Sequence, residues 1–352
     1  DGVVRFWKLP VAAKPLPGHS GPVRGVQSAA NGQWSLTWSD DKVVRVWAAG
    51  GGAQQQFTQH AQPVRAVALR ADEAIVASGD AEGVVWVWNP SNAAVEGVVA
   101  AHGGAVRGLA FSADSSLLVT AGADGLVRGW KLPLPKQKPA AGEAAPMPAW
   151  EFRAPDNEVI AQMKRISPEH GLVLLPAAGT RLHRLQWDGT LAGSAGSPGG
   201  ALRSVETAAS GKMLLAVADN GAIHQFNADL SVLRSLPAIP GLTSAKWDRE
   251  GRQLLVCQNQ PWVQVRSVET GRVQEQIPVA AAVQSADWLA ADQTQVLGVT
   301  GANEPQLLQR SLLRLWELPA GASVLAMSPD QQHMFAAGMD GQIRQWNLGN
   351  GE

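Results

Sequence analysis

The sequence predicts an all-β fold built from one repeated unit of short strands. Three observations support this prediction: a string that recurs, a nearly constant spacing between recurrences, and alternation of apolar and polar residues within each period. The first ten residues, DGVVRFWKLP, return almost unchanged as DGLVRGWKLP at 124–133 and as DGQIRQWNLG at 340–349.

The repeat length follows from the residue that ends the third strand of each period. Successive positions of this kind lie 37–43 residues apart, except for one step of 55. They are Trp7, Trp47, Trp88, Trp130, Leu185, Phe226, Arg266, Gln309 and Trp346. The longer step contains residues 131–149, which are rich in Pro, Ala and Lys. We interpret them as an extended or mobile insertion in a third-to-fourth strand loop.

Each period contains three short strands that end in polar turns, and a less regular fourth strand. The first strands are typified by PVRGVQSAANGQ and AVRGLAFSADSS, the second by WSLTWSDD and LLVTAGADG, and the third by KVVRVW and LVRGW. No stretch keeps a helical spacing of apolar residues. Four short strands in about 40 residues are typical of a β-propeller blade.

Counting these strand sets predicts a ring of eight four-stranded blades. The sets end at Trp47, Trp88, Trp130, Leu185, Phe226, Arg266, Gln309 and Trp346. The last set lacks a fourth strand, so we expect residues 1–17 to close the ring with the C-terminal blade. The alternative is seven blades plus a partial blade. We treat 1–352 as a single propeller domain, and we expect its start to be a cut through a longer repeat array.

The repeats resemble the WD40 family, in a divergent form similar to bacterial WD40 repeat proteins. The resemblance rests on Gly18-His19, Gln59-His60 and Ala101-His102, whose histidines each precede the third-strand tryptophan by 28 residues. It implies hydrogen-bonded networks that satisfy buried polar groups. Their members would be His19, Thr37, Asp41 and Trp47; His60, Ser78, Glu82 and Trp88; and His102, Thr120, Asp124 and Trp130. No third strand ends in Trp-Asp, and the later repeats lack the Gly-His element.

The composition argues against several classes of function. A formal net charge of −1 gives no electrostatic footprint for nucleic acid. No apolar run is long enough to span a membrane, and one cysteine, Cys257, excludes an internal disulfide. We find no HExxH, no GxSxG and no phosphate-binding loop, so we expect no catalytic residue, metal or cofactor. His183 and His224 precede third-strand ends and are interpreted as exposed surface positions.

Four arginines recur near the start of first strands, which run beside the channel of a propeller. They are Arg24, Arg65, Arg107 and Arg203. One interpretation is an arc on the top face that grips an acidic peptide, because arginine is frequent in interface hot spots and pairs bidentately with carboxylates. The other is solubilising charge paired with turn acids such as Asp40 or Glu82.

The predicted function is therefore a non-catalytic protein-interaction scaffold, a prediction that rests on analogy of fold. We expect the domain to be monomeric. Its partner would be a protein or peptide bound at the top face and channel mouth, without nucleic acid or membrane insertion. The alternatives are a propeller module of a larger bacterial, cytochrome-linked protein and, least favoured, a propeller enzyme. Cytoplasmic and periplasmic locations are both open.

Overall fold

The computed structural model describes most of the chain in two compact units. One unit is Ala12–Arg310, and the other combines Asp1–Val11 with Ser311–Glu352. The described residues are 3–4, 14–15, 19–29, 33–48, 53–139, 144–208, 210–248, 251–258, 260–279, 283–288, 295–300, 305–309, 316–317, 322–327, 333–338 and 343–347. The single domain predicted over 1–352 stays a prediction.

Within the described residues of Ala12–Arg310, six blades each consist of four consecutive antiparallel strands. The inner strands are β3 (Val23–Ser28), β7 (Val64–Leu69), β11 (Val106–Phe111), β15 (Ile160–Ser167), β19 (Leu202–Thr207) and β23 (Leu242–Trp247). The second strands are β4 (Trp34–Ser39), β8 (Val76–Asp80), β12 (Leu117–Gly122), β16 (Gly171–Pro176), β20 (Met213–Ala218) and β24 (Gln253–Gln258). We number these blades first to sixth in chain order.

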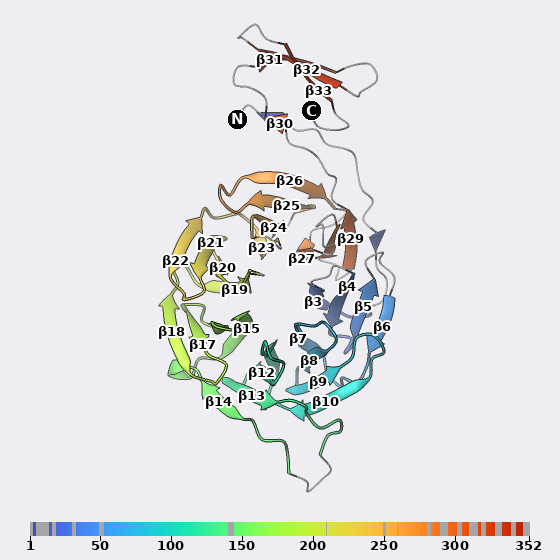
Figure 1. The fold of residues 1–352 in the computed structure, drawn as a ribbon, viewed down its shortest axis with the longest axis vertical. Helices are drawn as coiled ribbons and strands as arrows, with labels where there is room; N and C mark the ends of the chain where they lie inside the picture. The colour runs from blue at the N-terminus through green and yellow to red at the C-terminus, as the bar shows by residue number, and fades with distance from the viewer. Residues whose placement is uncertain are drawn as a thin grey trace. The chain divides into compact units, whose positions relative to one another are not determined.

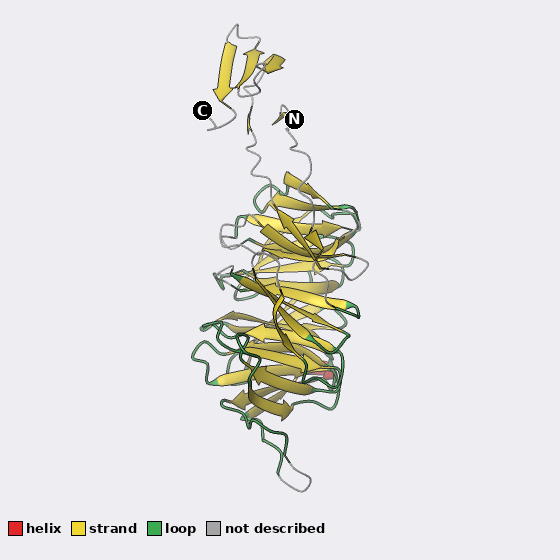
Figure 2. Ribbon diagram, turned by 90° about the vertical axis from the view of Figure 1, so that its right-hand side faces the viewer, coloured by secondary structure: helices red, strands yellow, loops and turns green. Residues whose placement is uncertain are grey.

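The outer half of each blade has the same order. The third strands are β5 (Val44–Ala48), β9 (Val84–Trp88), β13 (Leu126–Lys131), β17 (Arg181–Leu185), β21 (Ile223–Asn227) and β25 (Trp262–Ser267). The fourth strands are β6 (Ala53–Phe57), β10 (Val95–Ala100), β14 (Trp150–Arg153), β18 (Leu191–Gly196), β22 (Val232–Leu236) and β26 (Val273–Pro278). Strands dominate the described chain, and the 3-10 helix η1 (Pro155–Asn157) is a short exception (Figure 2).

A further sheet, which we call the closing sheet, completes the ring. It contains β27 (Val283–Trp288), β28 (Gln295–Thr300) and β29 (Pro305–Gln309), and its outer strand is β2 (Lys14–Pro15) from near the start of the chain. Lys14 pairs with Leu307 in antiparallel register. The inner strand β27 contacts β3 of the first blade, so the sheets close into a ring around a central axis (Figure 1).

The prediction of eight blades is wrong, and the alternative of seven blades plus a partial blade does not hold either. The described residues form six blades of four consecutive strands, while the closing sheet takes its outer strand from the other end of the ring. The strand set ending at Trp346 belongs to the other unit. That unit contains a three-stranded sheet, β31 (Ala322–Met327), β32 (His333–Gly338) and β33 (Ile343–Asn347), and β1 (Val3–Val4) paired with β30 (Trp316–Glu317).

The physical reason for the difference is that the local sequence pattern indicates where strands form, but it does not indicate which strands pair with one another. The N-terminal segment offers an edge strand, and edge strands are stabilised by any partner that satisfies their backbone groups. Within the described pairings that partner is β29. The pairing of residues 1–17 with the C-terminal blade stays a prediction.

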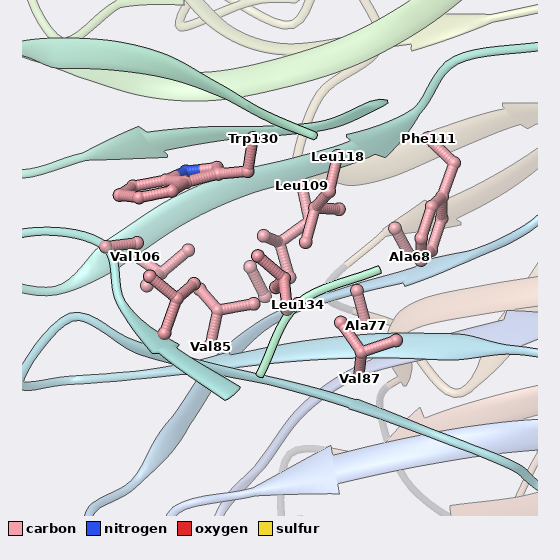
Figure 3. Packing of buried hydrophobic residues seen from close by; sticks show 13 residues of the cluster. Ala68, Ala77, Val85, Val87, Val106, Leu109, Phe111, Leu118, Trp130 and Leu134 are labelled. Atoms are coloured by element: carbon pink, nitrogen blue, oxygen red, sulfur yellow. The ribbon is translucent and has the colours of Figure 1, made fainter. Parts of the chain in front are cut away.

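The hydrophobic core is divided among the interfaces between neighbouring blades. One cluster joins Ala68 and Val87 of the second blade to Leu109, Phe111 and Trp130 of the third, and Phe111 lies beside Ala68 (Figure 3). Similar clusters join the other neighbouring blades. Burying one large apolar side chain contributes about 1.5–3 kcal/mol. Each blade therefore depends on its neighbours, which holds the channel-facing strands in a fixed arrangement.

Candidate functional site

A hydrogen-bonded chain crosses the first blade from its third strand to the preceding loop. Trp47 Nε1 donates to Thr37 Oγ1 at 2.8 Å, and the same oxygen lies 2.7 Å from His19 Nε2. His19 Nδ1 lies 2.9 Å from Asp41 Oδ2. The structure thus brings together all four residues expected from the sequence in this blade.

The chemistry of the partners assigns the protons in this chain. A carboxylate only accepts, so His19 Nδ1 carries a proton, and a neutral Nε2 then accepts the Thr37 hydroxyl proton. Burial lowers the pKa of His19 despite the hydrogen bond and charge of Asp41. Arg45 Nη1 donates to Asp41 Oδ2 at 3.0 Å and balances the carboxylate charge. The histidine is therefore a neutral structural link.

The third blade repeats this geometry. Trp130 Nε1 donates to Thr120 Oγ1 at 3.0 Å, Thr120 Oγ1 lies 2.8 Å from His102 Nε2, and His102 Nδ1 lies 3.0 Å from Asp124 Oδ1. Burial again lowers the pKa of His102. Arg128 Nη1 donates to Asp124 Oδ2 at 3.0 Å, as Arg45 does in the first blade.

The second blade corrects one predicted member of the networks, because Asp80 replaces Glu82. His60 Nδ1 lies 3.2 Å from Asp80 Oδ2, and Ser78 Oγ lies 2.8 Å from His60 Nε2. Asp80 lies two residues after Ser78 on β8, hence on the same face of the strand. Glu82 lies in the following turn and accepts from Gln62 Nε2 at 2.7 Å. The signal in the sequence was an acid where the equivalent positions are Ser39 and Gly122.

Two histidines interpreted as exposed are buried, and that interpretation is wrong. His183 is fully buried and lies 2.6 Å from Ser194 Oγ and 3.0 Å from Glu158 Oε2. His224 lies 2.7 Å from Ser235 Oγ. Both histidines face a serine on the neighbouring fourth strand, so they link third and fourth strands where Arg45 and Arg128 link to turn acids.

His183 lies between the hydroxyl of the exposed Ser194 and the carboxylate of Glu158, which is the arrangement of residue types in a catalytic Ser-His-Glu triad. The equivalent pair in the fifth blade lacks the acid, because His224 Nε2 lies 3.3 Å from the Gly199 carbonyl oxygen. A pairing that repeats between blades with different third members is explained by cross-strand satisfaction of buried histidines. We assign it a structural role.

The four predicted arginines share an unusual backbone position. In each inner strand of the ring the register shifts after the first residue, which leaves the second residue as a β-bulge. These second residues are Arg24, Arg65, Arg107, Ala161, Arg203, Thr243 and Gln284. A bulge redirects its side chain away from the regular sheet faces. Three consecutive blades therefore carry arginine at the same position of their inner strands.

A single carboxylate joins two of these arginines. Arg65 Nη1 of the second blade donates to Asp40 Oδ1 at 2.8 Å, and Arg24 Nε of the first blade donates to the same oxygen at 2.8 Å. The hydrogen bond from Arg24, with the charge of Arg65, holds the pKa of Asp40 below its ordinary value. Pairing with a turn acid, the alternative interpretation, thus applies to both arginines.

The other two arginines have different surroundings. Arg107 is exposed, and among the described residues it has no ion pair. Arg203 Nη2 donates to the backbone oxygen of Leu242 in the sixth blade, which ties two inner strands together. The structure brings Arg24 and Arg65 together, leaves Arg107 available to solvent, and gives Arg203 a contact between blades.

A second charged feature, which the sequence analysis missed, links the remaining inner strands. Lys164 Nζ lies 3.2 Å from Glu206 Oε2, and Lys246 Nζ lies 3.2 Å from Asp287 Oδ2. Asp287 Oδ2 also accepts from the backbone N–H of Ser28 at 3.2 Å. Each of these charged residues is the fifth residue of its inner strand when the bulge residue is counted. We call Lys164, Glu206, Lys246 and Asp287 the inner ladder.

The ladder is electrically coupled along its length. Burial opposes ionisation of Glu206, but Lys164 and Lys246 hold its pKa below the ordinary value. Burial opposes the charge of Lys246 as well, and Asp287 with Glu206 raises its pKa. Alternating charges on four consecutive sheets therefore neutralise one another.

The remaining chemistry-bearing groups are sparse in the described part of the chain. Burial raises the pKa of the Cys257 thiol to about 12, so it stays protonated. Among the described residues, no group of three His, Cys, Asp or Glu side chains could hold a metal ion. The described residues also include no helix long and apolar enough to cross a membrane.

Antiparallel blades around a channel, three of them crossed by a histidine–hydroxyl–tryptophan chain, define a β-propeller. The family model for the WD domain, G-beta repeat, matches residues 11–48, 51–89, 95–131 and 314–347. These four matches, together with the propeller fold, support a WD40-repeat β-propeller family for the chain. The first three matches cover the blades with these networks, and WD40 propellers are commonly non-catalytic scaffolds for protein interaction.

Proposed function

We propose that this propeller is a non-catalytic platform that binds an acidic peptide or loop of a protein partner. The observation that carries the proposal is the arginine at the bulge of three consecutive inner strands, with a fourth at Arg203. The bulge fixes where each side chain leaves the sheet, so the cations are positioned before a partner arrives.

The contacts of the four arginines indicate how much each should contribute to binding an acidic partner. Arg107 is exposed and can form a bidentate pair with a carboxylate, the geometry that guanidinium groups favour. Arg24 and Arg65 share Asp40, so a partner carboxylate would compete with it for hydrogen bonds. Arg107 should therefore contribute most, Arg24 and Arg65 less, and Arg203 through the position of its strand.

The test is binding of a fluorescein-labelled peptide of alternating Glu and Gly, followed by fluorescence anisotropy at low and high salt. We expect Arg107→Ala to weaken binding about tenfold, and Arg24→Ala with Arg65→Ala to weaken it further. Arg181→Ala is the matched control, because Arg181 is exposed at the start of β17. Equal binding by wild type and Arg107→Ala, with circular dichroism unchanged, would refute the proposal.

A further inference from the structure

The insertion between β13 and β14 is attached to the neighbouring second blade. Leu134 is 6% exposed and packs in the cluster that contains Val85 and Val99 (Figure 3). Its backbone neighbour Pro135 accepts a hydrogen bond from the N–H of Val98 at 2.7 Å. A side chain at Gly97 would collide with Leu134, since its Cβ would lie 2.7 Å from Leu134 Cβ. The insertion therefore covers the outer edge of β10.

Two lysines extend this attachment. Lys136 Nζ forms an ion pair with Glu96 Oε2 at 2.9 Å. Lys138 Nζ lies 5.8 Å from the centre of the Trp86 ring, within the range of a cation–π contact. Together with Leu134 these contacts hold the segment 131–139 in a defined position on the outer rim.

Two adjoining hollows lie on the insertion. The larger, of about 530 Å³, is lined by Pro135, Lys136, Gln137, Lys138, Pro139, Ala144 and Pro146. The smaller, of about 230 Å³, is lined by Trp130, Lys131, Pro133, Leu134, Pro135, Pro146, Met147 and Ala149. The Met147 side chain is 87% exposed beside the smaller hollow. Among the described residues that line the two hollows, the charged ones are Lys131, Lys136 and Lys138.

We propose that these hollows are a docking site for an acidic peptide of another protein that carries apolar side chains. Charge complementarity selects the occupant, because two of the lysines have no carboxylate partner among the described residues. Lys131 is exposed, and Lys138 lies over the Trp86 ring, whereas Lys136 is paired with Glu96. Proline walls offer rigid apolar surface at little entropic cost, and methionine adapts to irregular side chains.

The same features argue against two other occupants. A strand added to the insertion would need backbone donors, and the prolines lining the hollows have none. Anionic membranes are typically bound by flat clusters of about four to eight basic residues, whereas three lysines border these hollows. An extended peptide satisfies both the charge and the apolar walls.

The experiment uses the full chain and a fluorescein-labelled peptide in which glutamates alternate with leucines, followed by anisotropy. We expect Lys131→Glu with Lys138→Glu to weaken binding about tenfold or more, and Met147→Ser about threefold to tenfold. Met147→Ser changes an exposed side chain, so it leaves folding intact. Lys212→Glu, an exposed lysine before β20, is the matched control and should bind as wild type.

Further measurements distinguish binding at these hollows from binding at the arginine arc (Arg24, Arg65, Arg107 and Arg203). They also distinguish a peptide from other occupants of the hollows. Replacing the peptide leucines by glycine should remove the effect of Met147→Ser, and hydrogen exchange should slow at residues 131–139 when peptide is added. The proposal is overturned if Lys212→Glu weakens binding as much as the paired lysine variant. Equal binding of phosphatidylserine vesicles, or self-association that Met147→Ser abolishes, would overturn it as well.

Discussion

Replacing Thr120 by Val removes one buried hydroxyl without changing the volume of the side chain. The Thr120 oxygen is fully buried, accepts from Trp130 Nε1 at 3.0 Å and lies 2.8 Å from His102 Nε2. The variant leaves two buried groups without a partner, each costing about 1–3 kcal/mol. We expect the free energy of unfolding to fall by about 2–6 kcal/mol. Urea unfolding followed by tryptophan fluorescence and circular dichroism measures the loss.

The matched control is Thr190→Val, the same chemical change at an exposed residue, with an expected effect within about 0.5 kcal/mol. Trp130→Phe removes the indole donor, so Thr120→Val should cost about 1 kcal/mol less in that background. Equal destabilisation by Thr120→Val and Thr190→Val would refute the reasoning, because the hydroxyl would then satisfy nothing that water cannot.

Two further predictions concern the same networks. Asp80→Asn should lower the free energy of unfolding by about 1.5–3 kcal/mol, because Asp80 is 2% exposed and hydrogen-bonded to His60. Glu82→Gln should lower it by less than about 0.5 kcal/mol. A lower urea midpoint for Glu82→Gln than for Asp80→Asn would contradict the assignment of Asp80 to this network. Burial lowers the pKa of His102 below 6.5. As the pH is lowered below 6.5, the unfolded chain therefore takes up a proton at this histidine more readily than the folded chain, and the free energy of unfolding should decrease. This loss should be smaller for His102→Asn in urea titrations, and an unchanged pH profile would sink the argument.

The sequence was sufficient for features that depend on neighbouring residues. Alternation and polar turns predicted the strand sets, and the resemblance to WD40 repeats implied which groups would meet Trp47 and Trp130. It was insufficient where two local solutions compete. Asp80 and Glu82 both follow Ser78 at even spacing, and only the length of β8 decides which carboxylate faces His60.

Features that depend on residues elsewhere in the chain were predicted only in part. Residues 1–17 were expected to close the ring, but their described partner, β29, was not identified. The closing contact of Lys14 with Leu307 joins residues that no local pattern connects. The burial of His183 depends on Ser194 and Glu158, which supply the hydrogen bonds that make an interior imidazole acceptable. An imidazole and a guanidinium occupy equivalent third-strand positions in different blades, so position alone does not reveal exposure.

The channel-facing strands divide their charges unevenly, and this favours the arginine arc as the place where an acidic partner is drawn in. On one side, the inner ladder alternates lysine and carboxylate, so its charges cancel. On the other side, the fifth residues of β3, β7 and β11 are uncharged: Gln27, Ala68 and Ala110. There, Arg24 and Arg65 share the carboxylate of Asp40, and Arg107 has no ion pair among the described residues. Since net charge near a channel mouth raises the rate of encounter with an opposite charge, association should start at the first three blades.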